Sequence, residues 1–124
     1  MIRVFLAFGD ATFGEPLFEY LNEQPDFQVC GRVEIRDEVV RGAIELRPDI
    51  AILETAAEND LEVADAFKQH IPSPPLLLVA EEVSLETEKK ALAHGVDAVF
   101  PMEDDPAALA LNVRALYDLN RSRQ

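Results

Sequence analysis

The hydrophobic positions of the chain fall into two patterns that alternate from one end to the other. Nearly continuous apolar runs are typical of strands covered on both faces, and they predict strands at residues 2–8, 27–33, 50–53, 76–80 and 97–100. Apolar residues three or four positions apart predict helices in the segments that follow, at residues 12–24, 39–46, 61–71, 85–94 and 106–119. The chain therefore repeats strand and helix five times.

Residues with preferences for helix ends support these boundaries. Thr12 and Glu15 have the spacing of a capping box at the start of the first helix. Ser84 is a suitable N-cap for the fourth helix, and Gly95 is suited to the left-handed position after it. Asp105 is followed by a proline, the preferred combination of N-cap and first helical residue.

Strands joined by helices require right-handed crossovers, which lead to a parallel sheet covered on both faces. The pattern therefore predicts an α/β fold of the doubly wound, flavodoxin-like (βα)5 type, with strand order 2-1-3-4-5. The strand at 27–33 alternates apolar and polar residues, which places it nearer an edge. Ligands of such folds bind outside the carboxyl ends of the strands, so the informative residues are 8–10, 54–55, 79–81 and 101–102.

Composition and charge narrow the class of protein. The 124 residues predict one domain spanning 1–124, and 11 Lys and Arg against 24 Asp and Glu give a net charge of −13. This charge would repel nucleic-acid phosphates and anionic lipids, so we expect protein partners, with no nucleic acid and no membrane. A single cysteine excludes an internal disulfide, and the apolar stretch at the N-terminus is too short for a membrane span, so we expect a cytoplasmic protein.

Four segments resemble the bacterial response-regulator receiver (CheY-like) domains, and the resemblance covers essentially the whole chain. They are IRVFL at 2–6, EQPDFQVCG at 23–31, LRPDIAILE at 46–54 and ALAHGVDA at 91–98. The resemblance implies a receiver of two-component, phosphorelay signal transduction. In that family a histidine kinase supplies a phosphoryl group to an aspartate after the third strand, and an acidic pair after the first strand holds Mg²⁺.

The residues of this chain depart from the family pattern at each of these positions. The positions of the degenerate phosphorylation site are Phe8, Gly9, Asp10, Glu54, Val79, Val99 and Met102. Glu54 takes the acceptor position, and the acidic pair becomes Phe8 and Gly9, with Asp10 one step further on. The hydroxyl, the switch aromatic and the lysine of the family become Val79, Val99 and Met102.

These departures remove the chemistry that the resemblance would otherwise imply. Mg²⁺ needs oxygen ligands and a phosphoryl group in transfer needs counter-charge, yet Phe8 and Met102 supply neither. Glu54 is one methylene longer than the usual acceptor, which misplaces its carboxylate for in-line attack. We therefore expect no catalytic residue, no metal, no cofactor and no enzyme activity, but a pseudo-receiver that binds proteins without phosphorylation.

Alternatives remain open at this point. Glu54 is either a drifted, tolerated carboxylate or a built-in mimic of the phosphorylated acceptor. A working receiver that uses Glu54 as an unusual acceptor is the second hypothesis for function. A small-molecule-binding flavodoxin-like domain, with Phe8, Val79 and Met102 lining an apolar pocket, is the third.

The partner surface is expected on the face formed by the helix at 85–94, the strand at 97–100 and the helix at 106–119. In receivers this is the docking face, and acidic residues surround it here, which favours a basic protein. Leu111 lies opposite the inward stripe of the last helix, with Tyr117 and Leu119 flanking that stripe, and this favours a weak homodimer. The C-terminal ending also suits a piece cut from a longer protein with a following output domain.

Overall fold

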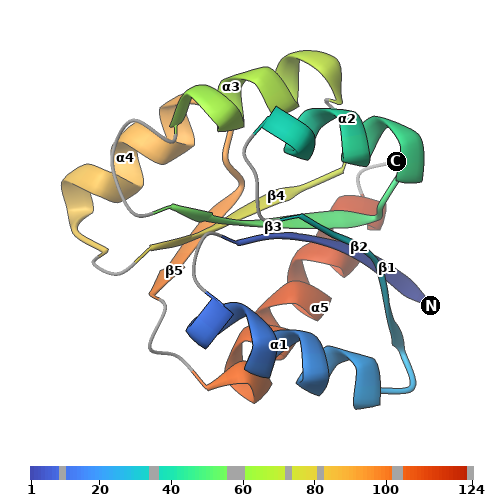
Figure 1. Ribbon diagram of the computed structural model, residues 1–124. Coiled ribbons are helices and arrows are strands. Elements are labelled where there is room, and N and C mark those ends of the chain that lie inside the picture. The colour runs from blue at the N-terminus through green and yellow to red at the C-terminus, as the bar shows by residue number, and fades with distance from the viewer. Residues whose placement is uncertain are drawn as a thin grey trace.

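The structure is a computed structural model, and it describes residues 1–8, 11–33, 37–55, 61–71, 74–80, 83–101 and 105–122. Strands and helices alternate along it as predicted (Figure 1). The strands are β1 (Ile2–Ala7), β2 (Phe27–Val33), β3 (Ile50–Thr55), β4 (Leu76–Ala80) and β5 (Ala98–Pro101). The helices are α1 (Ala11–Glu23), α2 (Asp37–Leu46), α3 (Leu61–His70), α4 (Leu85–Ala93) and α5 (Pro106–Ser122). None of these helices is both long and apolar enough to cross a membrane.

The strands form one parallel sheet in the order β2-β1-β3-β4-β5, which confirms the predicted doubly wound, flavodoxin-like fold. Helices α1 and α5 cover one face of the sheet, and α2, α3 and α4 cover the other (Figure 1). Alternate residues of each strand therefore enter different cores, as Val4 and Leu6 do on the α1 and α5 face and Phe5 and Ala7 on the opposite face. β2 lies at an edge of the sheet, as its alternating pattern predicted.

Three of the predicted helix ends are confirmed. The Thr87 amide donates to Ser84 Oγ over 3.1 Å, and the Ala107 amide donates to Asp105 Oδ1 over 3.0 Å. Gly95 has φ +91°, the left-handed conformation that ends α4 after His94.

Several predicted element ends differ from the observed ones by one to three residues, and two of these differences change the role of a named residue. α1 begins at Ala11, so Thr12 lies inside the helix and is not its N-cap. Alanine propagates a helix more readily than threonine does, which favours this earlier start. β5 begins at Ala98, not at Asp97, because Asp97 is held by a different set of hydrogen bonds.

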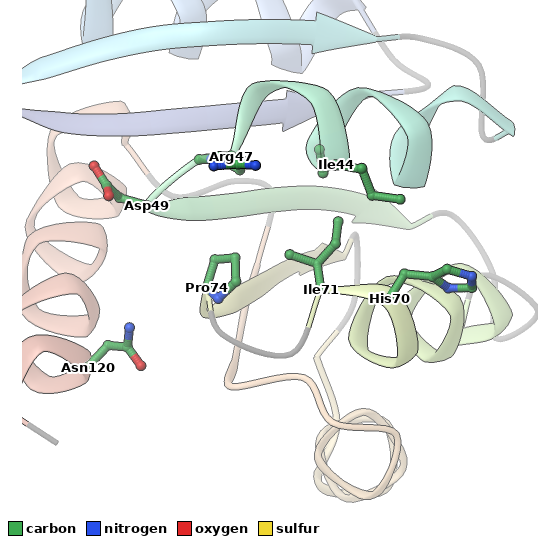
Figure 2. Close-up of a pocket in the computed structure, with 9 residues that line it drawn as sticks. Ile44, Arg47, Asp49, His70, Ile71, Pro74 and Asn120 are labelled. Atoms are coloured by element: carbon green, nitrogen blue, oxygen red, sulfur yellow. The ribbon is translucent and has the colours of Figure 1, made fainter. Parts of the chain in front are cut away.

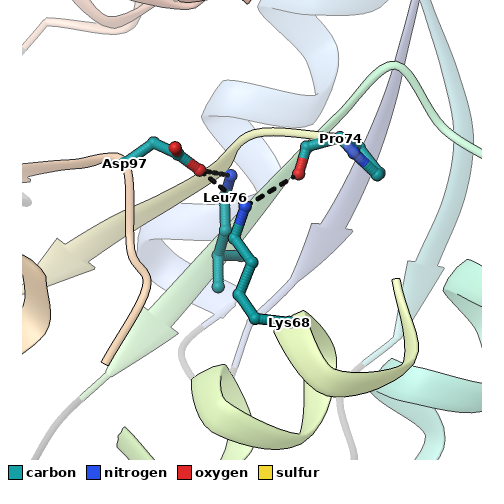
Figure 3. Close-up of polar contacts among 4 residues, drawn as sticks. All are labelled: Lys68, Pro74, Leu76 and Asp97. Carbon is teal, nitrogen blue, oxygen red and sulfur yellow. Dashed lines mark hydrogen bonds and ion pairs between the residues drawn. The ribbon is translucent and has the colours of Figure 1, made fainter. Parts of the chain in front are cut away.

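Asp97 joins the amino ends of β4 and β5 to the C-terminal part of α3 (Figure 3). Asp97 Oδ2 accepts the Leu76 amide over 2.7 Å and the Lys68 ammonium over 2.8 Å. Lys68 also donates to the Pro74 carbonyl over 3.0 Å, and its side chain is 18% exposed. The Asp97 carboxylate thus pairs with the more buried Lys68 ammonium and accepts the amide at the start of β4.

Arg114 fixes α5 against the turn between α1 and β2. Its guanidinium donates to both carboxylate oxygens of Asp26, with Nε to Oδ2 at 2.6 Å and Nη2 to Oδ1 at 3.0 Å. It also lies over the Phe27 ring, 4.8 Å from the centroid. The hydrogen bond from Arg114 lowers the pKa of Asp26 below its usual value. The inward side of α5 is therefore anchored by polar contacts as well as by the core.

Candidate functional site

The carboxyl ends of the parallel strands meet at one edge of the sheet. Ala7 is in register with Leu53, Glu54 with Val79, and Val79 in turn with Phe100. This register brings the ends of β1, β3 and β4 together, so three of the predicted site residues, Phe8, Glu54 and Val79, lie in adjacent strand ends. Gly9, Asp10 and Met102 lie outside the described residues.

Phe8 fills the position where the resemblance would put a metal-binding carboxylate. It follows β1 and is only 5% exposed, within the core cluster beneath α1 and α5. Its ring lies directly against Gly14 of α1: a Cβ built on Gly14 would be 2.5 Å from Phe8 Cδ2 and 2.8 Å from Cγ. The space between the strand end and the helix is therefore occupied by the aromatic ring.

Val79 and Glu54 complete the described part of this edge. Val79 is fully buried in the same cluster as Phe8 and offers no hydroxyl. Glu54 is partly buried and alternates along β3 with Leu53, which belongs to the opposite cluster, so its side chain starts on the face shared by Phe8 and Val79. One carboxylate thus lies among apolar strand ends.

Val99 lies on the other face of the sheet. It is partly buried and packs against the core beneath α2, α3 and α4, whereas its neighbour Phe100 packs against the core that contains Phe8. Val99 therefore serves as a packing residue of β5 and does not join the group formed by Phe8, Glu54 and Val79.

A metal site needs several ligating side chains close together. Within the described ranges, no three His, Cys, Asp or Glu side chains are grouped closely enough to hold a metal. Cys30 is half-buried on β2, its thiol lies 3.5 Å from the Val4 carbonyl, and burial raises the pKa of the thiol. A raised pKa disfavours the thiolate, the form that binds metals and attacks electrophiles.

A pocket of about 360 Å³ lies at the opposite edge of the sheet, between the C-terminal ends of α2, α3 and α5 (Figure 2). It is lined by Ala43, Ile44, Arg47, Pro48, Asp49, His70, Ile71, Pro74 and Asn120. Sequence reasoning missed it, because the segment at 46–54 that contributes Arg47, Pro48 and Asp49 was interpreted only for its resemblance to receivers and no pattern links it to His70 or Asn120. Asp49 accepts the Arg3 amide over 2.8 Å, and His70 Nδ1 lies 3.0 Å from the carbonyl of Ala66 in its own helix. These polar groups are thus engaged in local structure.

Comparison with known proteins shows which proteins the chain is similar to in sequence. No family model matches the chain. The protein-glutamate methylesterase/protein-glutamine glutaminase 1 of Syntrophus aciditrophicus is 29% identical over 103 residues, which are 80% of this chain and 29% of that protein. The protein-glutamate methylesterase/protein-glutamine glutaminase of Pyrococcus abyssi is 26% identical over 120 residues, which are 94% of this chain and 32% of that protein. The chain thus spans about a third of the length of these relatives.

Solved structures give the same fold over nearly the whole chain. A LuxR-family two-component response regulator from Aurantimonas has a TM-score of 0.86 at 18% identity, covering 95% of this chain and 86% of that one. A CheY-like receiver domain protein from Methanospirillum hungatei has a TM-score of 0.85 at 15% identity, covering 100% and 99%. The response regulator domain of Thermotoga maritima CheB has a TM-score of 0.83 at 22% identity, covering 95% and 97%. The chain therefore has the response-regulator receiver, or CheY-like, fold.

Proposed function

We propose that this chain is a receiver-type module of bacterial two-component signal transduction that binds proteins without being phosphorylated. The observation that carries the proposal is the burial of Phe8 against Gly14, at the strand end where receiver chemistry needs a carboxylate. An aromatic ring there supplies no oxygen ligand, and it also occupies space beside the strand end. Phe8 thus supplies no oxygen ligand and at the same time fills the space in which a ligated ion would lie.

Phosphoryl transfer depends on positioned counter-charge more than on any covalent chemistry of the protein. Val79 brings no hydroxyl to hold a phosphoryl oxygen, and the sequence offers Met102 where receivers have a lysine. Glu54 keeps a carboxylate at the acceptor position, while the matching positions of the sequence carry Phe8, Gly9 and Met102 instead of an acidic pair and a lysine. These residues support a docking role and do not support catalysis.

Glu54 is best interpreted as a drifted acceptor that the strand end tolerates. The hydroxyl and the aromatic switch residue, which would report a phosphorylated acceptor, are both valines here, Val79 and Val99. A phosphomimic role would make partner binding depend on the charge of Glu54, so the substitution Glu54→Gln distinguishes the two interpretations. Unchanged affinity for a partner supports the drifted acceptor.

The surface formed by α4, β5 and α5 is the proposed docking face for a protein partner. Leu85 is 69% exposed and Leu92 is 47% exposed on α4, and the acidic Glu86 and Glu88 are exposed beside them. Exposed apolar side chains suit a partner with apolar anchors, while the charge beside them is mixed, because Lys89 and Lys90 are also exposed on α4 and Lys90 pairs with Glu86 over 3.4 Å. The net charge of −13 of the whole chain favours a basic partner.

Intact-mass measurement after incubation with acetyl phosphate and Mg²⁺ tests the proposal. We expect no added phosphoryl group on the parent chain, while an active receiver treated in the same way gains one. A phosphoryl adduct that is lost in Glu54→Gln would overturn the proposal and establish the unusual-acceptor hypothesis. The small-molecule hypothesis has less support, because Phe8 and Val79 pack into the core instead of lining open space.

A further inference from the structure

The pocket between the ends of α2, α3 and α5 lies at the edge of the sheet opposite the candidate site (Figure 2). Its volume of about 360 Å³ is at the lower end of the range of roughly 300–1,000 Å³ that small-molecule pockets usually have. None of its lining residues belongs to the candidate site, so the proposed function gives this pocket no role.

Apolar side chains form much of the pocket. They are here called the apolar wall, and they are Ala43, Ile44, Pro48, Ile71 and Pro74. Ile44 is 47% exposed, so part of this wall is a large aliphatic side chain that the core of the domain does not bury. A concave apolar wall favours a ligand whose body is itself apolar.

Two polar side chains of the pocket have no partner in the part of the chain that the structure describes. The Arg47 guanidinium and the Asn120 amide line the pocket from different helix ends, and neither makes a hydrogen bond or an ion pair with a described residue. Asp49 differs from them, because its Oδ2 already accepts the Arg3 amide. Arg47 and Asn120 are therefore the groups that remain available to a ligand.

The backbone of Arg47 is a second reason to assign its side chain a role. Among the described residues, Arg47 is the one residue other than glycine with a positive φ, at +47°. Its amide donates to the Ala43 carbonyl over 2.9 Å, and it directly follows α2, at the position where glycine is preferred. A residue with a Cβ is strained there, so the arginine carries a cost to the fold that a ligand-binding role would explain.

We propose that this pocket binds a small organic carboxylate with an apolar body. Arg47 holds the carboxylate, since a guanidinium pairs with a carboxylate through two parallel hydrogen bonds that fix orientation as well as supply charge. Figure 2 shows Arg47 beside Ile44 on the α2 side, across from Ile71, so the apolar wall is placed to receive the body of the same ligand. Asn120 can donate or accept one further hydrogen bond. This binding goes beyond the proposed docking function and does not depend on it.

The charges at this edge permit an anion in spite of the net charge of −13. Arg3 donates from Nη1 to the Arg47 carbonyl over 2.8 Å, so two guanidinium groups stand near the single carboxylate of Asp49. Free carbonyls at helix ends would disfavour an anion, but those of Ala43 and Phe67 already accept backbone amides. The Arg47 side of the pocket is therefore positive.

Titration followed by proton–nitrogen correlation spectra tests the site with three probes. Hexanoate has both the carboxylate and the apolar body, hexan-1-ol lacks the charge, and acetate lacks the body. We expect hexanoate to shift the amide signals of residues 43–47, Ile71 and Asn120 in a saturable manner, with a dissociation constant in the millimolar range that suits so small a ligand. Hexan-1-ol and acetate should each bind at least about tenfold more weakly, because each lacks one of the two contacts.

The substitution Arg47→Gly separates binding from folding. Glycine relieves the left-handed backbone, so the melting temperature of the ligand-free variant should rise by a few degrees, while its affinity for hexanoate falls at least about tenfold. Ile44→Gln should weaken hexanoate severalfold and leave acetate unchanged, because it alters only the apolar wall. Arg41→Gln is the matched control, since it removes an exposed charge of α2 outside the pocket and should leave hexanoate binding unchanged.

Several results would overturn the inference. Hexan-1-ol that binds as tightly as hexanoate would show that the pocket does not recognise the carboxylate. Saturable shifts outside the pocket, or none with hexanoate at tens of millimolar, would show that no such site exists there. Unchanged hexanoate binding in Arg47→Gly, or a lower melting temperature of that variant, would show that the arginine serves the fold and not a ligand. Each of these results would leave the proposed function standing, since the acetyl phosphate experiment tests it separately.

Discussion

The contact between Phe8 and Gly14 gives the sharpest test of the structure. Gly14 lies within α1, where a glycine normally costs about 1 kcal/mol relative to alanine. Elsewhere in a helix, Gly→Ala would therefore stabilise the fold. Here the added Cβ would meet Phe8 Cδ2 at 2.5 Å, well inside van der Waals contact, and the Cγ of the same ring at 2.8 Å.

The expected magnitude follows from these two opposing effects. Overpacking of this kind costs about 1–3 kcal/mol, which cancels or exceeds the gain in helix propensity, so Gly14→Ala should lower stability by up to about 2 kcal/mol. In a Phe8→Ala background the clash is absent, and the same substitution should raise stability by about 1 kcal/mol. The coupling between the two positions is then about 1–3 kcal/mol.

Equilibrium urea unfolding followed by far-ultraviolet circular dichroism measures all four members of this cycle, since the chain has no tryptophan. Gly42→Ala is the matched control, because a Cβ there would meet Phe5 on the opposite face of the sheet at 3.0 Å. Its effect should be the same with or without Phe8. An equal effect of Gly14→Ala in both backgrounds would refute the packing of Phe8 against α1.

Further predictions concern the polar contacts and the left-handed turn. Because the pKa of Asp26 is lowered by Arg114, its contribution to stability is present at pH 7, above the unfolded pKa, and is lost as pH falls through the folded value. We therefore expect Asp26→Asn to cost at most about 1 kcal/mol at pH 7, as for a solvent-screened pair, and nothing near pH 2, as measured by urea unfolding at each pH. Asp97→Ala should cost about 1–3 kcal/mol in the same assay, because it leaves the partly buried Lys68 ammonium without its carboxylate, and an unchanged midpoint would contradict the contacts of Asp97. Gly95→Ala should lower the melting temperature by several degrees, since φ +91° strains any residue with a Cβ, and a stabilised variant would argue against that conformation.

The sequence was sufficient to predict the fold because each strand and helix has its own periodicity. The fully apolar β4 and the alternating β2 differ as a central and an edge strand should, and both were placed correctly. Ser84 and Gly95 marked the ends of α4 because capping depends on local backbone geometry. Local signals therefore account for most of the correct predictions.

The start of β5 was missed because distant residues decide the local structure there. Asp97 has the hydrogen-bonding role described above because Leu76 and Lys68 are brought to it by the sheet, and no local pattern shows this. The bulge between β1 and β2 is similar: Val4 pairs with Val29 and Phe5 with Gly31, which leaves Cys30 as the extra residue. Such features depend on register, which an isolated strand pattern does not contain.

In the candidate site, too, some features follow from the residues themselves and others depend on contacts with distant residues. That Phe8 and Val79 lack ligating atoms follows from their chemistry alone, so the sequence itself predicts a degenerate phosphorylation site, which the acetyl phosphate experiment tests. The packing of these side chains could not be predicted, because the Phe8 ring fits only where Gly14 of α1 leaves room for it. The need for a glycine at position 14 is evident only from the structure, in which the Phe8 ring lies against it.

The proposed loss of receiver chemistry would have a physical basis in where the apolar residues of the candidate site lie. A cluster of carboxylates at strand ends repels itself and resists burial, so active sites of this kind are held at a cost in stability. Phe8 and Val79 stand where the resemblance would put polar groups, and both side chains join the core beneath α1 and α5, so they add buried apolar surface where the fold already packs. Under the proposed function, the same apolar residues that are unsuited to phosphoryl transfer would stabilise the scaffold that presents the outer faces of α4 and α5.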